Sequence, residues 1–213
     1  MHASISTFRG DPDDLLARYD AMIADIPAAS MRLHLCLRSD DGIVVVDTVY
    51  VSHNTPTIDG ITTVEVRDRV YESGTLTEDT LDWYAQDDHG NVWYLGELST
   101  QLPDGTHTGS WTAGVNGAQP GYIMEANPAV GDAYCQENAP GAAQDAAQVL
   151  SLTASRSVPY GTFSGNVLQT KDYSLIEPHS EHKFYAPGVG MLEALALNGG
   201  SEDIQLYTIQ HNQ

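Results

Sequence analysis

The sequence predicts a mainly β protein, α+β overall, in which an antiparallel β-meander closes into a barrel or sandwich behind an N-terminal helix and β-hairpin. Two observations carry this prediction. From about residue 56 onward, strand-like runs follow one another at roughly ten-residue spacing, with Gly, Pro or Asn between them. The 213 residues also suit one domain, or one domain with a small appendage, because single cores typically serve about 100–200 residues.

The first fifty residues differ in character from the rest and are predicted as a separate unit, 1–50, before a barrel-like domain at 51–213. Residues 11–26 place apolar side chains at helical spacing behind a candidate N-cap and a proline, which predicts an amphipathic helix. The next stretch, "MRLHLCLRS", alternates strictly and is joined by "DDG" to "IVVVDTVYV". Residues 31–51 are therefore predicted to form the hairpin.

Two further hairpins are predicted at the start of the second unit. The runs "ITTVEVRDRVYESG" and "LTEDTLDWYAQD" pair around Gly74, and "DWYAQD" pairs with "NVWYLGE" around the turn "DHG". The later strands are predicted in "DAYCQE", "AAQVLSLTAS", "TFSGNVLQT", "EHKFYA", "MLEALAL" and "EDIQLYTIQ".

The charge of the chain argues against two classes of partner. The sequence has 29 acidic residues and 9 lysines and arginines, a formal net charge of -20. Such a surface repels phosphate backbones and anionic headgroups, so neither nucleic acid nor a membrane surface is expected as a partner. No stretch approaches the ~18 apolar residues of a membrane span, and the start "MHASISTFRGDPDD" does not resemble a signal peptide. As written, the chain is expected to be soluble and cytoplasmic.

Long motifs occur between about residues 56 and 209. The first reads "DGITTVEVRDRVYESGTLTEDTLDWYAQDDHGNVWYLGE", and "GSWTAGVNGAQPGYIM", "VPYGTF" and "EHKFYAPGVG" follow it. They resemble the motifs of a family of uncharacterised bacterial proteins that are mostly secreted or lipid-anchored. The resemblance implies a β-rich, barrel-like domain and, in contrast to the start of this sequence, export. It implies no established activity.

The N-terminal segment has a different resemblance. Residues 5–48 look like the first half of a dimeric ferredoxin-like domain of the antibiotic-biosynthesis-monooxygenase type, without the second helix and last strand of that domain. This resemblance suggests a fusion near Thr48, in which the hairpin 31–51 replaces the missing edge strands of the barrel. A half domain leaves an exposed sheet edge, and pairing with a second copy is one remedy, so a homodimer is predicted.

Strand alternation suggests a metal site inside the barrel. Alternate side chains face opposite sides of a sheet, and His182, Glu97 and Glu137 share their predicted faces with apolar or aromatic neighbours. Buried carboxylates are costly unless they are paired or bind a cation. If the three side chains converge, they form an N/O site for zinc or another divalent ion, with an open position for water. A metal-bound water is a nucleophile for small esters or phosphoesters, including phosphotriesters, so a metal-dependent hydrolase is the leading prediction.

Ordinary structural roles remain open for the same residues. Solvation or pairing with Arg67 and Arg69 would also explain Glu97 and Glu137, and a place in the core would explain His182. A fourth candidate metal ligand, His34, lies two positions from Cys36 on one face of the hairpin. The competing interpretation of that face is a solvated outer surface.

The alternative function is a non-catalytic, lipocalin-like binder of a small lipophilic ligand. The aromatic residues Trp83, Trp93 and Phe184 are its candidate ligand contacts, and ordinary core packing is the competing interpretation. In the hydrolase, Asp82 and Tyr84 share one strand face and are candidates for the general acid or base. A third alternative is an interaction module whose edge strands pair with a partner.

Overall fold

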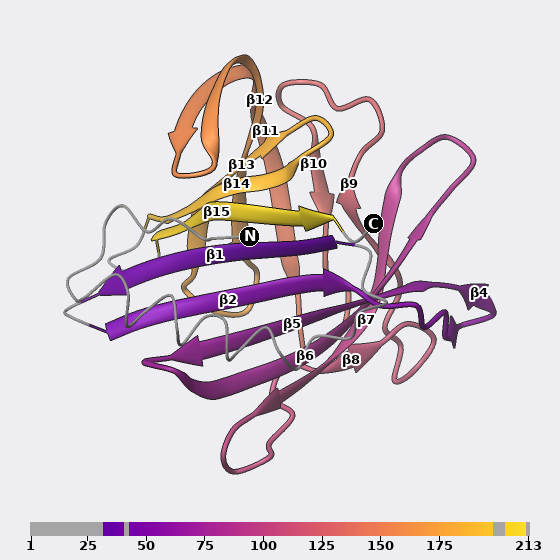
Figure 1. The fold of residues 1–213 in the computed structure, drawn as a ribbon. Helices are drawn as coiled ribbons and strands as arrows, with labels where there is room; N and C mark the ends of the chain where they lie inside the picture. Colours follow the sequence, from indigo (N-terminus) through magenta and orange to yellow (C-terminus); the bar gives the residue numbers. More distant parts are fainter. Residues whose placement is uncertain (1–31, 41–42, 198–202, 212–213) are drawn as a thin grey trace.

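The computed structural model describes residues 32–40, 43–197 and 203–211 (Figure 1). Within these ranges the chain forms antiparallel strands and no helix, which confirms the prediction of a mainly β, antiparallel meander. The predicted helix at 11–26 lies outside the described residues. Among the described segments, none is a helix long and apolar enough to cross a membrane.

In the described part of the chain, thirteen strands form one sheet, in the order β10-β11-β12-β13-β14-β15-β1-β2-β5-β6-β7-β8, and β9 pairs with β7 beside β8. Most neighbours in the sheet follow each other along the chain, and the pairing of β15 with β1 joins the two ends of the meander. The strands are β1 (Arg32–Asp40), β2 (Ile43–Val51), β5 (Val64–Glu72), β6 (Thr75–Gln86), β7 (Val92–Gln101), β8 (Trp111–Thr112), β9 (Gly121–Met124), β10 (Ala133–Cys135), β11 (Asp145–Val158), β12 (Gly161–Ser174), β13 (Ser180–Ala186), β14 (Gly190–Ala196) and β15 (Asp203–His211). A separate two-stranded ribbon consists of β3 (Thr57–Ile58) and β4 (Ile61–Thr62).

The predicted hairpin at 31–51 corresponds to β1 and β2, which pair from Leu33↔Tyr50 to Asp40↔Ile43. It lies within the sheet, with β15 on one side and β5 on the other. The first fifty residues therefore supply two interior strands to the same sheet as the rest of the chain.

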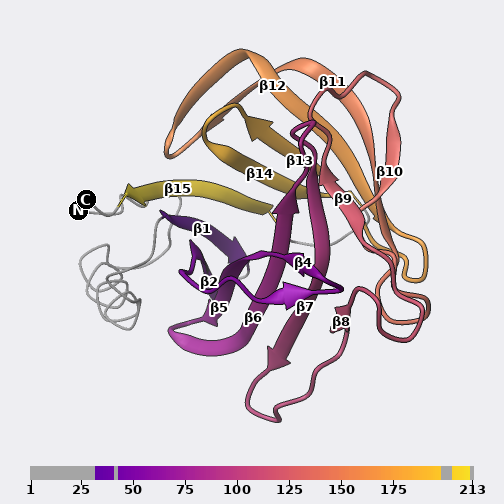
Figure 2. The same cartoon turned by 90° about the vertical axis from the view of Figure 1, so that its right-hand side faces the viewer.

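The sheet curls strongly but is not a closed barrel (Figure 2). Among the described strands, the hydrogen-bonded path ends at β10 on one side and at β8 and β9 on the other. An isolated bridge spans the seam between these ends, where the Gln119 N–H donates to the Asn138 carbonyl at 2.9 Å. Strand twist explains the curl, because sheets of more than about ten strands bend or split rather than stay flat.

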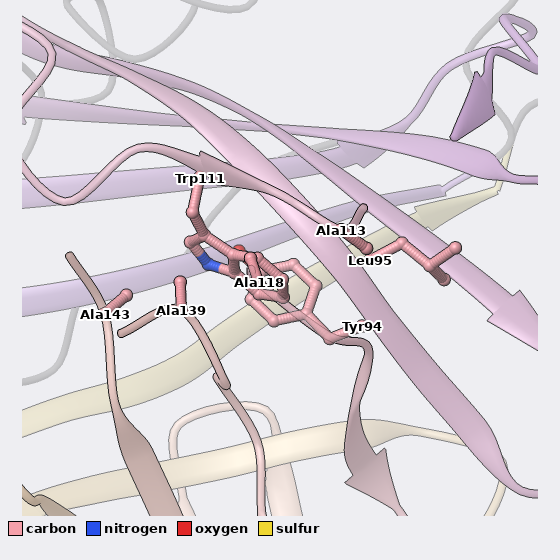
Figure 3. Close-up of a cluster of buried hydrophobic side chains, with 7 residues drawn as sticks. All are labelled: Tyr94, Leu95, Trp111, Ala113, Ala118, Ala139 and Ala143. Carbon is pink, nitrogen blue, oxygen red and sulfur yellow. The ribbon is translucent and has the colours of Figure 1, made fainter. Parts of the chain in front are cut away.

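One hydrophobic cluster lies where β7, β8 and the loops beside them meet (Figure 3). Trp111 packs edge-on against Tyr94, with ring centroids 5.4 Å apart. Small alanine side chains around these rings let the chain segments approach closely, and this packing holds Tyr94 in place. The buried members are Tyr94, Leu95, Trp111, Ala113, Ala118, Ala139 and Ala143.

A second cluster covers the outer face of β13 and β14. The distal half of the β11–β12 hairpin folds over this face, so that Val158 is buried together with Phe184 and Leu206. The Arg156 guanidinium lies 3.4 Å from the centroid of the Phe184 ring, a cation–π contact. Because neighbouring side chains of a strand alternate, Phe184 faces outward and Lys183 faces the inside of the curl.

Candidate functional site

A cavity of about 880 Å³ lies between the two halves of the curled sheet. One wall comes from β2, β5 and β6, and the other from β12, β13 and β14. Its volume falls in the range of about 300–1,000 Å³ that is typical of small-molecule sites. The lining is mainly apolar and includes Val49, Val66, Tyr84, Ile123, Leu168 and Tyr185.

Carboxyl groups continue the inner face of the sheet beyond this lining. Side chains two positions apart in a strand share a face and are separated by about 7 Å. The ladder register places Asp68 opposite Val49 and Asp82 opposite Val66, so three aspartates form a diagonal row, called here the aspartate row. Each lies two positions from a cavity-lining residue: Asp47 from Val49 on β2, Asp68 from Val66 on β5, and Asp82 from Tyr84 on β6.

A β-bulge extends the row of acids onto β7. Between the pairs Asp82↔Glu97 and Tyr84↔Tyr94, β7 contains one residue more than β6, and Gly96 at this point has a φ of 133°. The extra residue reverses the alternation, so Glu97 and Tyr94 face the same side although they are three positions apart. Uninterrupted alternation predicts instead that Glu97 shares a face with Trp93 and Leu95, and the bulge is the reason that this grouping differs from the structure.

Tyr94 connects the buried carboxyl group of Asp82 with the half-buried one of Glu97. Its hydroxyl oxygen lies 2.5 Å from Asp82 Oδ1 and 3.0 Å from Glu97 Oε2. One hydroxyl proton serves only one carboxylate, so the two contacts are satisfied when Tyr94 donates to Asp82 and a protonated Glu97 donates to Tyr94. Burial raises the pKa of Asp82 to about 7 and that of Glu97 to about 8, an order that agrees with this arrangement. Tyr84 stacks on Tyr94 at 4.8 Å and so links this group to the cavity.

Glu137 approaches the same carboxyls from the segment after β10. Burial raises its pKa to about 7 and Asp145 adds to this effect, while Trp111 and Lys183 oppose it. The charge of Glu137 in turn raises the pKa of Glu97. The structure therefore brings together two of the three side chains predicted to converge. Glu137 lies beyond the last residue of its strand, where strand alternation does not apply.

The other end of the aspartate row consists of Asp47 and Asp68. Asp47 is 8% exposed, and its side chain shares a hydrogen bond with that of Asp68. Burial raises the pKa of both carboxyls, and the contact with Asp47 raises that of Asp68 further. Within the described ranges, no lysine or arginine forms an ion pair with Asp47, Asp68 or Asp82. The row is therefore a group of interior acids without a described cationic partner.

The facing wall carries a half-buried cation, Lys183, that has partners of its own. Its Nζ lies 2.9 Å from Glu181 and 3.4 Å from Asp172, which also accepts a hydrogen bond from Gln136 Nε2 at 3.0 Å. Burial alone would lower the pKa of Lys183, but Tyr185, Glu181 and Asp172 hold it well above the ordinary value. Because two carboxylates already neutralise Lys183, it does not compensate the aspartate row.

His182 lies on the outer face of β13, on the side opposite to Lys183. Its ring centroid is 6.4 Å from that of Phe184, and burial together with nearby cations lowers its pKa. The structure therefore does not place His182 with Glu97 and Glu137. Alternation correctly groups His182 with Phe184, but it cannot say which face of the strand is the inner one. In the described part of the chain, no group of three or more His, Cys, Asp and Glu side chains has the arrangement of a metal site.

The other predicted site residues are dispersed. Trp83 lines a smaller pocket of about 270 Å³ together with Glu97, and Trp93 donates its indole N–H to Asp87 at 3.0 Å. Phe184 belongs to the outer cluster, so the lining of the large cavity includes none of the three predicted aromatic contacts. His34 lies in β1, and its side chain is outside the described residues. Of all the predicted residues, Tyr84 alone lines the large cavity.

The arginines considered as partners for the interior acids point elsewhere. Arg67 Nε donates to Asp79 Oδ1 at 2.6 Å, and Arg69 Nε lies 3.7 Å from the same carboxylate. This ion pair lies on the opposite face of β5 and β6 from the aspartate row. Pairing with these arginines therefore does not explain the acids at Glu97 and Glu137.

Comparisons with known proteins assign no family to the chain. No protein-family model matches it, and no curated protein matches it. A crystal structure from Bacteroides fragilis, of a candidate exported protein with a YmcC-like fold, superimposes with a TM-score of 0.47 at 13% sequence identity. The match covers 85% of this chain and 95% of that chain.

Proposed function

We propose that the protein is a non-catalytic binder of a small lipophilic molecule, which occupies the cavity of about 880 Å³. The observation that supports this function is the cavity itself, with apolar walls contributed by both halves of the sheet. Burial of hydrocarbon against such walls is favourable by about 25 cal/mol per Å². Tyr84 and Tyr185 add polar tips that would orient a ligand.

Filling the cavity is expected to abolish this binding. Val66→Trp should weaken the binding of the uncharged fluorescent probe N-phenyl-1-naphthylamine by about tenfold or more, because the indole would occupy ligand volume. Val130→Trp is the matched control, since Val130 is 65% exposed and lies outside the lining. Fluorescence titration measures the probe affinity of the parent protein and of both variants. A parent protein that does not bind the probe, or two variants that bind it equally well, would contradict the proposal.

A second candidate function is acid–base hydrolysis of a small ester at Asp82, Tyr94 and Glu97. The observation that favours it is the Tyr94 hydroxyl, which lies between the carboxyl groups of Asp82 and Glu97. Burial raises the pKa of Asp82 to about 7 and that of Glu97 to about 8, so near neutral pH one carboxyl would be largely protonated while its neighbour is partly ionised. Burial raises the pKa of Tyr84 well above its ordinary value, which makes it a weaker proton donor. A divalent ion such as zinc stays a prediction, with Glu97 and Glu137 as its remaining neighbouring ligand candidates.

Kinetics on chromogenic esters and phosphotriesters test this candidate. Glu97→Gln should lower turnover by about 10²–10⁴-fold, because it removes the protonated partner of Tyr94. Asp88→Asn, at an exposed turn position, removes one negative charge far from these residues and should leave turnover unchanged. Metal analysis and rates with and without a chelator separate the zinc-dependent version from the metal-free one. A parent protein without measurable turnover would exclude hydrolysis of these substrates.

A further inference from the structure

The cavity and the aspartate row together specify a ligand chemistry. We infer that the cavity takes a lipophilic cation, whose hydrocarbon part lies against the apolar lining while its ammonium group lies against Asp47, Asp68 and Asp82. This inference rests on the proposed binding function and adds the class of ligand. It follows from three features of the interior.

The first feature is the geometry of the strands. On β2, β5 and β6, the residue two positions beyond a cavity-lining side chain is an aspartate on the same face. That spacing is about 7 Å, which is close enough for one molecule to contact both. An apolar surface that ends in a row of carboxyls matches an alkyl chain that ends in a positive charge.

The second feature is the pair of acids at one end of the row. Asp47 is 8% exposed, and its side chain shares a hydrogen bond with that of Asp68, which is another acid and not a cation. Within the described ranges, no lysine or arginine forms an ion pair with either carboxyl group. A buried carboxylate is costly unless a cation lies close to it. An ammonium group in the row would supply the missing opposite charge.

The third feature is the aromatic wall between the two regions. Tyr84 lines the cavity, stacks on Tyr94, and lies two positions from Asp82. Tyrosine faces attract ammonium groups through the negative electrostatic potential of the ring. The formal net charge of -20 would also attract cations toward the protein and repel anionic lipids.

A bare metal ion fits these observations less well. The aspartate row runs diagonally over three strands, and no group of three or more ligating side chains in the described ranges has the arrangement of a metal site. The apolar lining would also have no role in holding a hydrated ion.

Ligands of equal chain length and different charge test the inference. Decyltrimethylammonium, decanol and decanoate are titrated against the protein with bound N-phenyl-1-naphthylamine. The cation should displace the probe at concentrations about tenfold lower than decanol, and decanoate should be the weakest. Equal displacement by all three would overturn the cation inference and leave the binding function standing. Absence of probe binding would overturn both the cation inference and the proposed binding function. Stabilisation by zinc or calcium ions alone, without an effect of decyltrimethylammonium, would also overturn the inference.

Charge-neutralising variants give an independent readout. Asp47→Asn and Asp82→Asn should each weaken decyltrimethylammonium binding by about tenfold or more, because loss of one partner of a buried charge pair is costly. Both should keep decanol affinity within about twofold, since the apolar lining is unchanged. Asp88→Asn, which changes the net charge equally at an exposed position, should bind both ligands like the parent. Equal losses for cation and alcohol in the Asp47 and Asp82 variants would contradict the assignment.

Discussion

Raising the pH from about 5 to about 8 is expected to lower the free energy of unfolding substantially. Burial raises the pKa of Asp82 and Glu137 to about 7 and that of Glu97 to about 8, whereas the same groups in an unfolded chain ionise near pH 4. Between these values the folded state binds more protons than the unfolded state. Stability therefore falls with rising pH, by about 1.4 kcal/mol per pH unit for each carboxyl that only the folded state keeps protonated.

Urea denaturation at several pH values measures this dependence. Glu97→Gln should make the free energy of unfolding depend less steeply on pH, because the amide cannot ionise. Asp88→Asn at the exposed turn should leave this pH dependence unchanged. Repulsion among the surface acids would act in the same direction, but salt screens it far more than it screens buried groups. A parent protein whose stability is constant or rises over this range, at high salt, would show that the interior acids titrate normally.

The strand pattern could be predicted because its causes are local. Alternation of β-branched and aromatic residues and the Gly-containing turns place β5, β6 and β7 close to the predicted runs. The pairing of β15 with β1 depends on contact between distant parts of the chain, and no local signal predicts it. The same holds for the outer cluster, because nothing in the sequence of the β11–β12 hairpin shows that its distal half folds over β13.

The site was only partly predictable. The cost of burying acids singled out Glu97 and Glu137, which the structure places close enough to interact. Alternation alone does not identify the inner face of a strand, so it could not separate His182 from them. One signal for the aspartate row was available: Asp47 interrupts the apolar run "IVVVDTVYV". Asp68 gave no such signal, because it lies between two arginines in "VRDRV" and looks solvent-exposed there.

Gly121→Ala is expected to destabilise the protein by about 3 kcal/mol or more, and to open the seam between β9 and the segment after β10. A Cβ atom at Gly121 would lie 2.2 Å from the Gln136 carbonyl oxygen and 2.6 Å from its carbon. Both are backbone atoms, so relief requires movement of the chain and not of a side chain. The bridge from Gln119 to Asn138 holds the same seam and would be strained.

Gly161→Ala is the matched control, because Gly161 also lies in a strand and has no left-handed φ. Its Cβ would meet only the Phe163 ring at 3.8 Å, an ordinary contact, so the change should be neutral or stabilise by about 0.4–1 kcal/mol. Urea denaturation measures the free energy of unfolding of both variants. Probe titration reports on the cavity, whose lining includes Ile123, two residues beyond Gly121. A Gly121→Ala variant within about 0.5 kcal/mol of the parent would mean that the two ends of the sheet do not meet this closely. If instead stability and probe affinity fall together, the contact between the two ends of the sheet also maintains the geometry of the cavity.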